Sequence, residues 1–530
     1  MTAEPSDEKE PNASGNASGL PDRFGYIGYF IVLAAVLFDR GALTVRFGWE
    51  RVGSDDAIFW NVAADIAKGD LHEPFLYGQN YNPALESLLA VPLLWCGMSP
   101  FKAFPIITSL LALLPFLAFG YYHMRRREFA QAVIITGVPL LLPVEFGLMT
   151  TISRGFVTGI AVLAALPTVL SIRSAVVRDV TLGTLLSFAV AINPNALVPG
   201  VPLFVHYALS SRRPVRSALC SMLGAIPPMI ALFLAMRFYA MDPDRIIHRL
   251  DDWRLVFYWK GLPIGLQQLD RHFSWTTPVW WPTGHVIIWM VLGVLITALI
   301  RRNRALACAL GSMLVLILFS FGFTKVHDGF EHPIFPFSRM FLALPLVLSW
   351  ALARSSFSPR MGRLVLAGML VAAPLYTAIK WHGSPAIITR WMQDQEALPV
   401  KEIDSRSIQR DLASLRAIIA DRPVDLMIFL REPALHHSML LAYGAAAVDP
   451  GLPPTLFMGK DRRIWRRREE TTAVRTNILI IGGDPVQWQR STEGPLSMEE
   501  VPCPAGPAHL ITGNTLPAYV LVQELGFRTE

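Results

Sequence analysis

Residues 53–89 read GSDDAIFWNVAADIAKGDLHEPFLYGQNYNPALESLL and directly follow the first long apolar segment of the chain. Apolar side chains recur at the 3.6-residue period of a helix in the first half of this stretch, and Ser54 or Asp55 can cap the helix start. These apolar side chains are Ile58, Phe59, Val62 and Ile66. We therefore expect an amphipathic helix that lies on the membrane surface and holds its first residues at the water boundary.

The composition around this stretch is that of a protein that crosses the membrane many times. The chain has 530 residues, is 52% hydrophobic, and has a mean hydropathy of +0.40. Apolar runs near the length of a membrane span recur throughout. We predict about eleven crossings, at 24–45, 101–123, 129–147, 152–172, 180–192, 196–209, 216–239, 285–300, 305–323, 339–352 and 362–381. The two runs on either side of Asn193 and Pro194 are alternatively one broken helix.

Arginine clusters between these runs set the orientation. They lie at 125–127, 173–178, 212–216, 301–304 and 354–363, two crossings apart, so all can face the cytoplasm. The net charge of +6 therefore reports membrane topology and does not indicate a nucleic-acid partner. The same parity places a first loop, 46–100, a second loop, 242–284, and everything from His382 onward outside. The apolar stretch 84–96 is too short to cross and is predicted to lie at the interface.

The chain divides into three parts by composition. Residues 1–22 are polar and are predicted to be a disordered cytoplasmic tail, and residues 23–381 form the membrane domain. Residues 382–530 are predicted to be an extracytoplasmic α/β domain. Within it, 405–420 has helical apolar spacing, while DLMIFL at 425–430 and NILIIGG at 477–483 are typical of buried parallel strands. The fold class predicted is mainly α, a polytopic helical membrane domain with a C-terminal α/β domain.

The acidic pair Asp55–Asp56 is the candidate catalytic feature. At the start of an interfacial helix, beside an apolar face, a carboxylate can accept a proton from a substrate hydroxyl. The alternative is that both aspartates only cap the helix. The residue pattern alone leaves the two interpretations open.

The order of features in the first external loop resembles that of a known family. An acidic pair opens an amphipathic helix just after the first membrane segment, and KGD, the aromatic GQNY stretch and an apolar interfacial helix follow. This resembles the GT-C glycosyltransferases of the branch that holds protein O-mannosyltransferases and the lipid A aminoarabinose transferase (glycosyltransferase family 39). The resemblance covers about the first 380 residues, by the topology above, and is strongest over 54–95.

The resemblance implies a transferase that moves a sugar from a polyprenyl-phosphate donor to a lipid, glycan or protein acceptor at the outer face, with inversion. Asp55, the first acid of the pair, would be the general base. The family usually has Asp–Glu where this chain has Asp–Asp, so the part played by Asp56 is less defined. Because a phosphate monoester leaves readily, no cofactor is expected, although a divalent cation is compatible with the reaction.

Cations at the outer face are candidates to bind the leaving phosphate. Arg154, in an external turn, and Arg339, at the start of a span, meet this condition, and Lys325 and His327 share the loop of Arg339. The alternative for each arginine is an interfacial side chain that reaches to lipid head groups.

The GQNY stretch and the acid that follows it are candidates to bind the sugar or the acceptor. They provide Gln79, Tyr81 and Glu86, although Glu86 is alternatively an acid at a helix end. The histidines lack the spacing of metal ligands, and we predict no metal site. The basic run KDRRIWRRREE at 460–470 is typical of a solvated helix face, or it rests on anionic lipid or a phosphate-bearing acceptor.

These observations favour a glycosyltransferase of the bacterial inner membrane, in contact with membrane lipids, whose active site and C-terminal domain are periplasmic. We expect the membrane domain alone to build the donor pocket. One alternative is a transporter or flippase of lipid-linked sugars, but the candidate polar residues cluster at one membrane face, not around broken helices at the midplane. Another, an assembly protein anchored by its outer domain, leaves the acidic loop unexplained.

Overall fold

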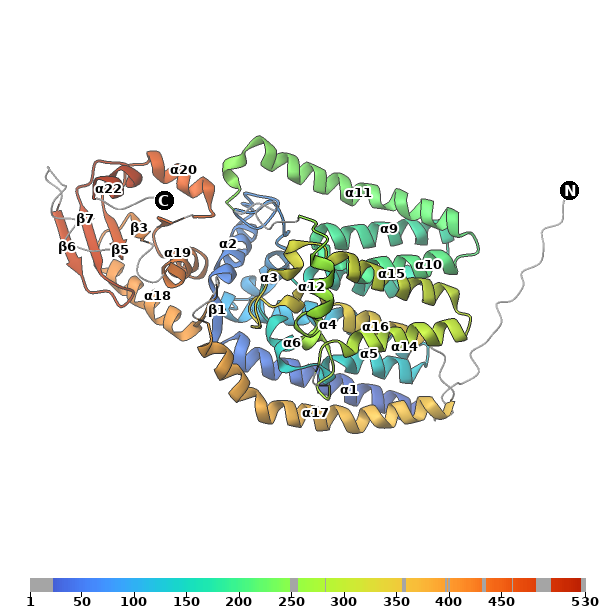
Figure 1. Ribbon diagram of the computed structural model, residues 1–530. Coiled ribbons are helices and arrows are strands. Elements are labelled where there is room, and N and C mark those ends of the chain that lie inside the picture. Colours follow the sequence, from blue (N-terminus) through green and yellow to red (C-terminus); the bar gives the residue numbers. More distant parts are fainter. Residues whose placement is uncertain are drawn as a thin grey trace.

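The computed structural model of the chain has a bundle of long helices with a smaller sheet-containing domain at one end (Figure 1). It describes residues 22–247, 256–281, 283–354, 359–395, 398, 401–430, 435–459, 461–482 and 497–525. The tail predicted at 1–22 lies outside the described residues except for Asp22. The predicted fold class is confirmed: the molecule is mainly helical, with a C-terminal α/β domain.

Each predicted span coincides with one helix or with a few consecutive helices. The bundle helices are α1 (Asp22–Leu43), α4 (Pro100–Arg125), α5 (Phe129–Leu141), α6 (Val144–Met149), α7 (Thr158–Val162), α8 (Leu166–Leu170), α9 (Ala175–Ile192), α10 (Leu197–Ser210), α11 (Pro214–Met241), α14 (Val286–Ile300), α15 (Arg304–Ser320), α16 (Leu344–Arg354) and α17 (Pro359–Gln393). Among the described residues, six helices are long and apolar enough to cross a membrane. These are Arg23–Gly48, Pro100–Arg125, Ala175–Ile192, Pro214–Met241, Phe337–Arg354 and Arg360–Gln393. The chain is thus a multi-pass membrane protein, and the other predicted spans correspond to shorter apolar helices.

The uncertain pair of runs near Asn193 forms two helices. α9 ends at Ile192, a 3₁₀ turn η3 (Pro194–Ala196) follows, and α10 begins at Leu197. The Asn193 side chain accepts a hydrogen bond from the Asn195 backbone N–H at 3.0 Å and so caps the turn. Proline cannot continue the hydrogen-bond ladder of α9, which explains the break.

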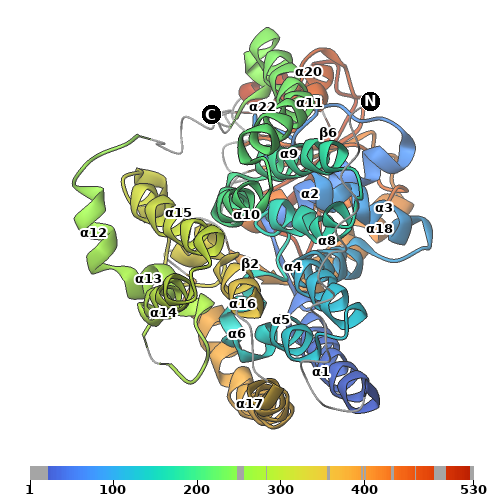
Figure 2. The same ribbon diagram turned by 90° about the vertical axis from the view of Figure 1, so that its right-hand side faces the viewer.

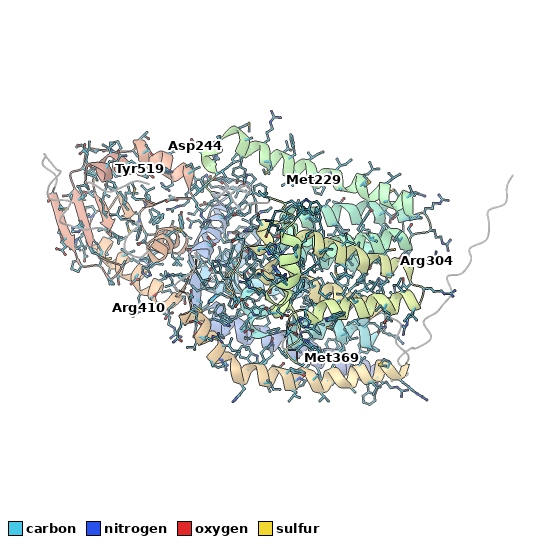
Figure 3. All side chains as sticks on the ribbon, in the orientation of Figure 1. Met229, Asp244, Arg304, Met369, Arg410 and Tyr519 are labelled. Carbon is cyan, nitrogen blue, oxygen red and sulfur yellow. The ribbon has the colours of Figure 1, made fainter. Side chains whose placement is uncertain are left out.

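The predicted cytoplasmic arginine clusters lie at the bundle end far from the C-terminal α/β domain (Figure 1), which is called the outer domain after its predicted side of the membrane. The α10–α11 and α14–α15 connections are at that end (Figure 1), and Arg304 is labelled there, whereas Asp244 is beside the outer domain (Figure 3). Viewed end-on, α17 lies beside α1 (Figure 2), so the last membrane helix packs next to the first.

The outer domain is built on a five-stranded sheet with the strand order β4-β3-β5-β7-β6. Its strands are β3 (Leu426–Phe429), β4 (Thr455–Phe457), β5 (Ile478–Ile481), β6 (Ser497–Val501) and β7 (Ala508–Thr512). β3 pairs in parallel with β4 and with β5, while β7 pairs antiparallel with β5 and β6. The two predicted strands are thus neighbours, with Leu426 opposite Ile478.

Helices cover both faces of this sheet, which explains the continuous apolar sequence of its central strands. Met427 and Phe429 pack toward α18 (Ser405–Ala420) and α19 (Leu435–Val448). The alternate residues Leu426 and Ile428 pack toward α22 (Ala518–Glu524). The predicted helix 405–420 has the observed bounds of α18.

The helix predicted to lie on the membrane surface, α2 (Ser54–Lys68), is instead covered by protein. Its apolar residues Ile58, Phe59 and Val62 are at most 1% exposed and share one core with α3 (Leu85–Trp95), α18 and α19. Buried Asn61 donates to the carbonyl of Tyr443 in α19 at 2.7 Å. The expectation of a lipid-facing helix was wrong because the outer domain supplies the apolar partner. The stretch 84–96 does form a short helix, α3, whose 11 residues span only about 16 Å.

A second, two-stranded sheet joins the outer domain to the first external loop. β1 (Arg51–Gly53) pairs antiparallel with β2 (Glu402–Asp404), and Gly53 is opposite Glu402. The predicted domain boundary at 381/382 lies inside α17, which continues to Gln393.

The arrangement predicts the sidedness of the connections. Reporter fusions after Arg127, Arg213 and Arg302 are expected to report the cytoplasm, and fusions after Ala240 and Ser405 the outside, because the basic connections share one end of the bundle. An alkaline phosphatase and fluorescent-protein pair of reporters measures this. An outside signal after Arg127 would make α3 a crossing and contradict the topology.

Candidate active site

Five chain segments at the outer end of the bundle surround a cavity of about 250 Å³. It is lined by Asp55, Phe59, Leu76, Gln79, Tyr81, Asn82, Arg154, Phe156, Asn193, Pro194, Asn195, Lys325, Phe335, Arg339 and Met340. Most of the predicted site residues therefore meet in one place, although they come from distant parts of the chain. Asp56, Glu86 and His327 do not line the cavity.

Asp55 lies in the first turn of α2, and its carboxylate is held by two guanidinium groups. Its Oδ1 is 3.2 Å from Nη2 of Arg462, and its Oδ2 is 3.7 Å from Nη1 of Arg154. The Asp55 side chain is 23% exposed and borders the cavity, so a ligand there can reach the carboxylate. Asp55 is thus accessible from the cavity, and its role as a general base stays a prediction.

Asp56 caps the helix. Its Oδ2 accepts a hydrogen bond from the Gly53 backbone N–H at 2.7 Å, at the N-cap of α2. Burial raises the pKa of Asp56 well above its usual range, and the neighbouring Glu402 carboxylate raises it further, while Arg154 and the Gly53 bond lower it. The capping interpretation therefore describes the contacts of Asp56, whereas Asp55 faces the cavity. A catalytic role for Asp56 stays a prediction.

Arg154 is buried among carboxylates. Its Nη2 donates to Oε1 of Glu402 at 2.8 Å, and the Arg154 and Glu402 side chains are 5% and 1% exposed. Asp55, Asp56 and Glu402 all stabilise its charged form and raise the pKa of Arg154, despite the opposing effect of burial. The cation that we predicted for a phosphate thus already forms ion pairs with two carboxylates, Glu402 and Asp55.

Glu86 supports the loop that carries Arg154. It is fully buried, accepts a hydrogen bond from the Gly155 backbone N–H at 3.2 Å, and accepts another from Oγ1 of Thr108 at 3.3 Å. Burial raises the pKa of Glu86 to about 8, against the lowering effect of these two bonds. The structure therefore places Glu86 behind the cavity wall and not at the substrate.

Gly155 and the asparagines complete that wall. Gly155 has φ +72°, and a Cβ there would lie 2.2 Å from Oδ1 of Asn82, so only glycine fits. Asn193 donates to the Gly155 carbonyl at 2.7 Å, and Asn195 donates to the Phe156 carbonyl at 2.5 Å. These bonds fix residues 154–156 against the turn between α9 and α10.

Gln79 and Tyr81 line the cavity as the GQNY stretch suggests. Gln79 is 8% exposed, and within the described part of the chain its Oε1 has no hydrogen-bond partner. The same holds for Oδ1 of Asn82, a residue with φ +64°. Buried amide oxygens without partners are costly, so these two are suited to accept hydrogen bonds from a ligand.

Lys325 and Arg339 place positive charge on the cavity wall. Nζ of Lys325 donates to Asp328 at 2.9 Å, and Arg339 donates to the carbonyls of Pro336, at 2.7 Å, and Asp328. Burial, together with the nearby Arg339 charge, lowers the pKa of Lys325 to about 8. This part of the cavity has fewer acidic neighbours than Arg154 has.

His327 does not share this wall. Its Nε2 is 2.8 Å from the Phe321 carbonyl, and its ring packs against those of His272 and Tyr258. Among the residues described, no group of three or more His, Cys, Asp or Glu side chains is arranged to hold a metal ion.

Two site residues from the outer domain, Glu402 and Arg462, were not predicted. Glu402 pairs with Arg154 across 248 residues of sequence, and Arg462 pairs with Asp55 across 407. All residues that line the cavity belong to the membrane domain, and the outer domain contributes partners to two of them, Arg154 and Asp55. That the membrane domain alone builds the donor pocket stays a prediction. The feature of the sequence that could have drawn attention to Arg462 is the acid Asp461, which interrupts the basic run directly before Arg462.

That basic run is only partly solvated. Asp461 is fully buried and pairs with Arg463 at 2.8 Å, and Trp465 stacks on His72 with ring centroids 4.0 Å apart. The run therefore docks α20 (Ile464–Thr472) on the first external loop. The prediction of a solvated face was wrong for this half of the run.

Comparison with known proteins addresses the fold. The sequence matches no protein-family model and no curated protein sequence. The structure matches ArnT from Cupriavidus metallidurans bound to undecaprenyl phosphate, with a TM-score of 0.52 and 13% identity, over 93% of this chain and 98% of that one. It matches the same protein in the apo state with a TM-score of 0.53 and 14% identity, over the same shares. The fold is GT-C-like.

This likeness confirms the resemblance stated above at the level of fold. It extends beyond the first 380 residues, because 93% of the chain is covered and the outer domain is therefore included.

The burial of Glu86 predicts a pH-dependent stability. The pKa of Glu86, about 8 in the folded chain, lies above its ordinary value of 4.5. The contribution of Glu86 to the free energy of unfolding is therefore fully present below pH 4.5 and is lost as the pH rises through about 8. Glu86→Gln removes this ionisation. Thermal unfolding in detergent from pH 5 to pH 9 is expected to show a smaller fall in Tm for Glu86→Gln than for the wild type. Parallel curves for the two would contradict the burial argument, and Glu331→Gln, at a side chain 70% exposed, is the control.

Proposed function

We propose that the protein is a membrane glycosyltransferase that takes a sugar from a polyprenyl-phosphate donor and transfers it to a lipid, glycan or protein acceptor. The proposed location is a bacterial inner membrane, with the cavity and the outer domain on the periplasmic side. The observation that carries the proposal is that Asp55, Lys325 and Arg339 line one cavity at the outer end of a GT-C-like bundle. The similar ArnT structure with undecaprenyl phosphate supports this donor class.

In the proposed reaction, Asp55 is the general base. The acceptor hydroxyl gives its proton to Asp55 while its oxygen attacks the anomeric carbon, and the bond from that carbon to the phosphate oxygen breaks. The polyprenyl phosphate leaves with the electron pair. A single displacement from the opposite face inverts the anomeric carbon.

We assign the leaving phosphate to Lys325 and Arg339. Developing negative charge is best stabilised by donors already fixed in a site that excludes water. Arg339 is 3% exposed and is fixed by two backbone carbonyls, and Lys325 lies near it.

Arg154 has a different part in this proposal from the one expected. Because Arg154 already forms ion pairs with Glu402 and Asp55, it contributes little attraction for a phosphate. We infer that Arg154 orients Asp55. Gln79 and Asn82, with their unpaired amide oxygens, are the proposed partners of sugar hydroxyls.

Replacement of the base tests the proposal. Asp55→Asn keeps the shape of the side chain but cannot accept the proton, so transfer is expected to fall about 10²- to 10⁴-fold. The measurement is turnover of polyprenyl-phosphate sugars by purified full-length protein at saturating donor. Asp70→Asn, at an aspartate 73% exposed at the far end of α2, is expected to keep wild-type turnover. If Asp55→Asn turned over near the wild-type rate, Asp55 would not be the general base, and the capping interpretation would stand.

Replacement of a residue assigned to the phosphate is expected to weaken binding of the donor lipid. Lys325→Met removes a donor to the phosphate, and the Kd for undecaprenyl phosphate, measured by microscale thermophoresis, is expected to rise about tenfold or more, as for loss of a charge-assisted hydrogen bond. Lys260→Met, at an exposed lysine of the same face, is the matched control. Equal Kd values for Lys325→Met and the wild type would show that Lys325 does not bind the phosphate.

A further inference from the structure

We propose that Arg462 of the outer domain is a gate for the base Asp55: it covers the carboxylate while no acceptor is bound and turns away when the acceptor enters. This rests on the proposed function and adds a residue that sets which hydroxyl can react. Water, present at high concentration, would otherwise compete with the acceptor for the donor. The gate would limit hydrolysis of the donor by water.

The contact blocks one oxygen of the base. Nη2 of Arg462 donates to Oδ1 of Asp55 at 3.2 Å, and the two side chains are 11% and 23% exposed. The charged groups around Asp55 are Arg154, Asp56, Glu402 and Arg462. Arg154 faces the other oxygen and is itself anchored by Glu402. Arg462 is thus the cation that can leave Asp55 without abandoning a second carboxylate.

The backbone of Arg462 is fixed, so only its side chain needs to move. Its backbone N–H donates to Oη of the buried Tyr443 at 2.8 Å. Residues on either side, Asp461 and Arg463, form a buried ion pair. Gly78, with φ +75°, lies so close that a Cβ there would be 2.8 Å from Cβ of Arg462. A backbone held this firmly suits a side chain that moves between two rotamers.

One nitrogen of the Arg462 guanidinium is unpaired. Nη1 of Arg462 is buried, and it has no hydrogen-bond partner within the part of the chain that the structure describes. An unpaired buried donor is costly, so a second position in which it binds an acceptor oxygen is favoured. The same group that covers Asp55 would then hold the acceptor.

The helix next to Arg462 provides a route for coupling. α20 begins two residues later, and Ile464, Arg467 and Arg468 line a second cavity of about 580 Å³ together with residues near Pro243. Trp465 of the same helix stacks on His72 of the first external loop. A molecule bound along α20 therefore contacts the helix that directly follows Arg462.

The test uses water in place of the unidentified acceptor. In hydrolysis, a water O–H gives its proton to Asp55, its oxygen bonds to the anomeric carbon, and the phosphate leaves with the electron pair. Full-length protein in detergent is given synthetic polyprenyl-phosphate monosaccharides, and the one that the wild type hydrolyses fastest is used throughout. Arg462→Met and Arg462→Gln are expected to hydrolyse it about two- to fivefold faster, since a partly exposed ion pair is weak.

The control and the alternatives are separable. Arg466→Met, in α20 four residues after Arg462 and paired with Glu469 at 2.8 Å, is expected to hydrolyse the donor at the wild-type rate. Hydrolysis by folded Arg462 variants at or below the wild-type rate would overturn the gate. Misfolding of both variants, seen as a lowered Tm, would also overturn it, because the side chain would then have a structural role.

Asp55→Asn measured in parallel distinguishes the two proposals. If it abolishes hydrolysis while the Arg462 variants leave the rate unchanged, only the gate is wrong. If Asp55→Asn hydrolyses the donor at the wild-type rate, the proposed base is wrong and the gate falls with it.

Discussion

The site depends on the pairing of one buried guanidinium, that of Arg154. A buried charge without a partner is very costly, and a buried pair is tolerated only when its geometry and remaining hydrogen bonds are satisfied. Glu402 supplies the closest partner at 2.8 Å, with Asp55 and Asp56 as further acidic neighbours, while Nε of Arg154 has no hydrogen-bond partner among the described residues. Since Glu402 belongs to the outer domain, the membrane domain without that domain would leave Arg154 short of its closest partner.

Contacts of three kinds join the two domains. Glu402 reaches Arg154 because β2 pairs with β1, immediately before α2. The apolar face of α2 then packs on α19, and Trp465 of α20 stacks on His72. A charge pair, a strand pair and a hydrophobic core thus fix the outer domain on the first external loop. Each holds the others in register, so the start of α2 and its Asp55 have a defined place relative to Arg462.

Local patterns predicted much of the fold, and topology predicted part of the site. The spacing of α18 and the apolar strands β3 and β5 depend on neighbours in sequence, and their bounds were predicted closely. Membrane topology gathers the external loops on one face, which is why Asp55, Gln79, Tyr81, Arg154, Lys325 and Arg339 line one cavity. Glu402 and Arg462 could not be found this way, because their partners lie 248 and 407 residues away. Nor could the covering of α2 be foreseen, since an apolar helix face fits lipid and protein equally well.

The arrangement of charges also bears on how a base can work between two cations. A guanidinium beside a carboxylate favours its charged form and so makes it a poorer proton acceptor. Arg154 cannot leave without removing the ion-pair partner of Glu402, whereas Arg462 has no second carboxylate partner among the described residues. Proton transfer to Asp55 therefore becomes easier by movement of one particular side chain, anchored through its backbone to the outer domain. In the proposed reaction, an acceptor that displaces Arg462 would in this way strengthen Asp55 as a base only when a hydroxyl is present to be deprotonated.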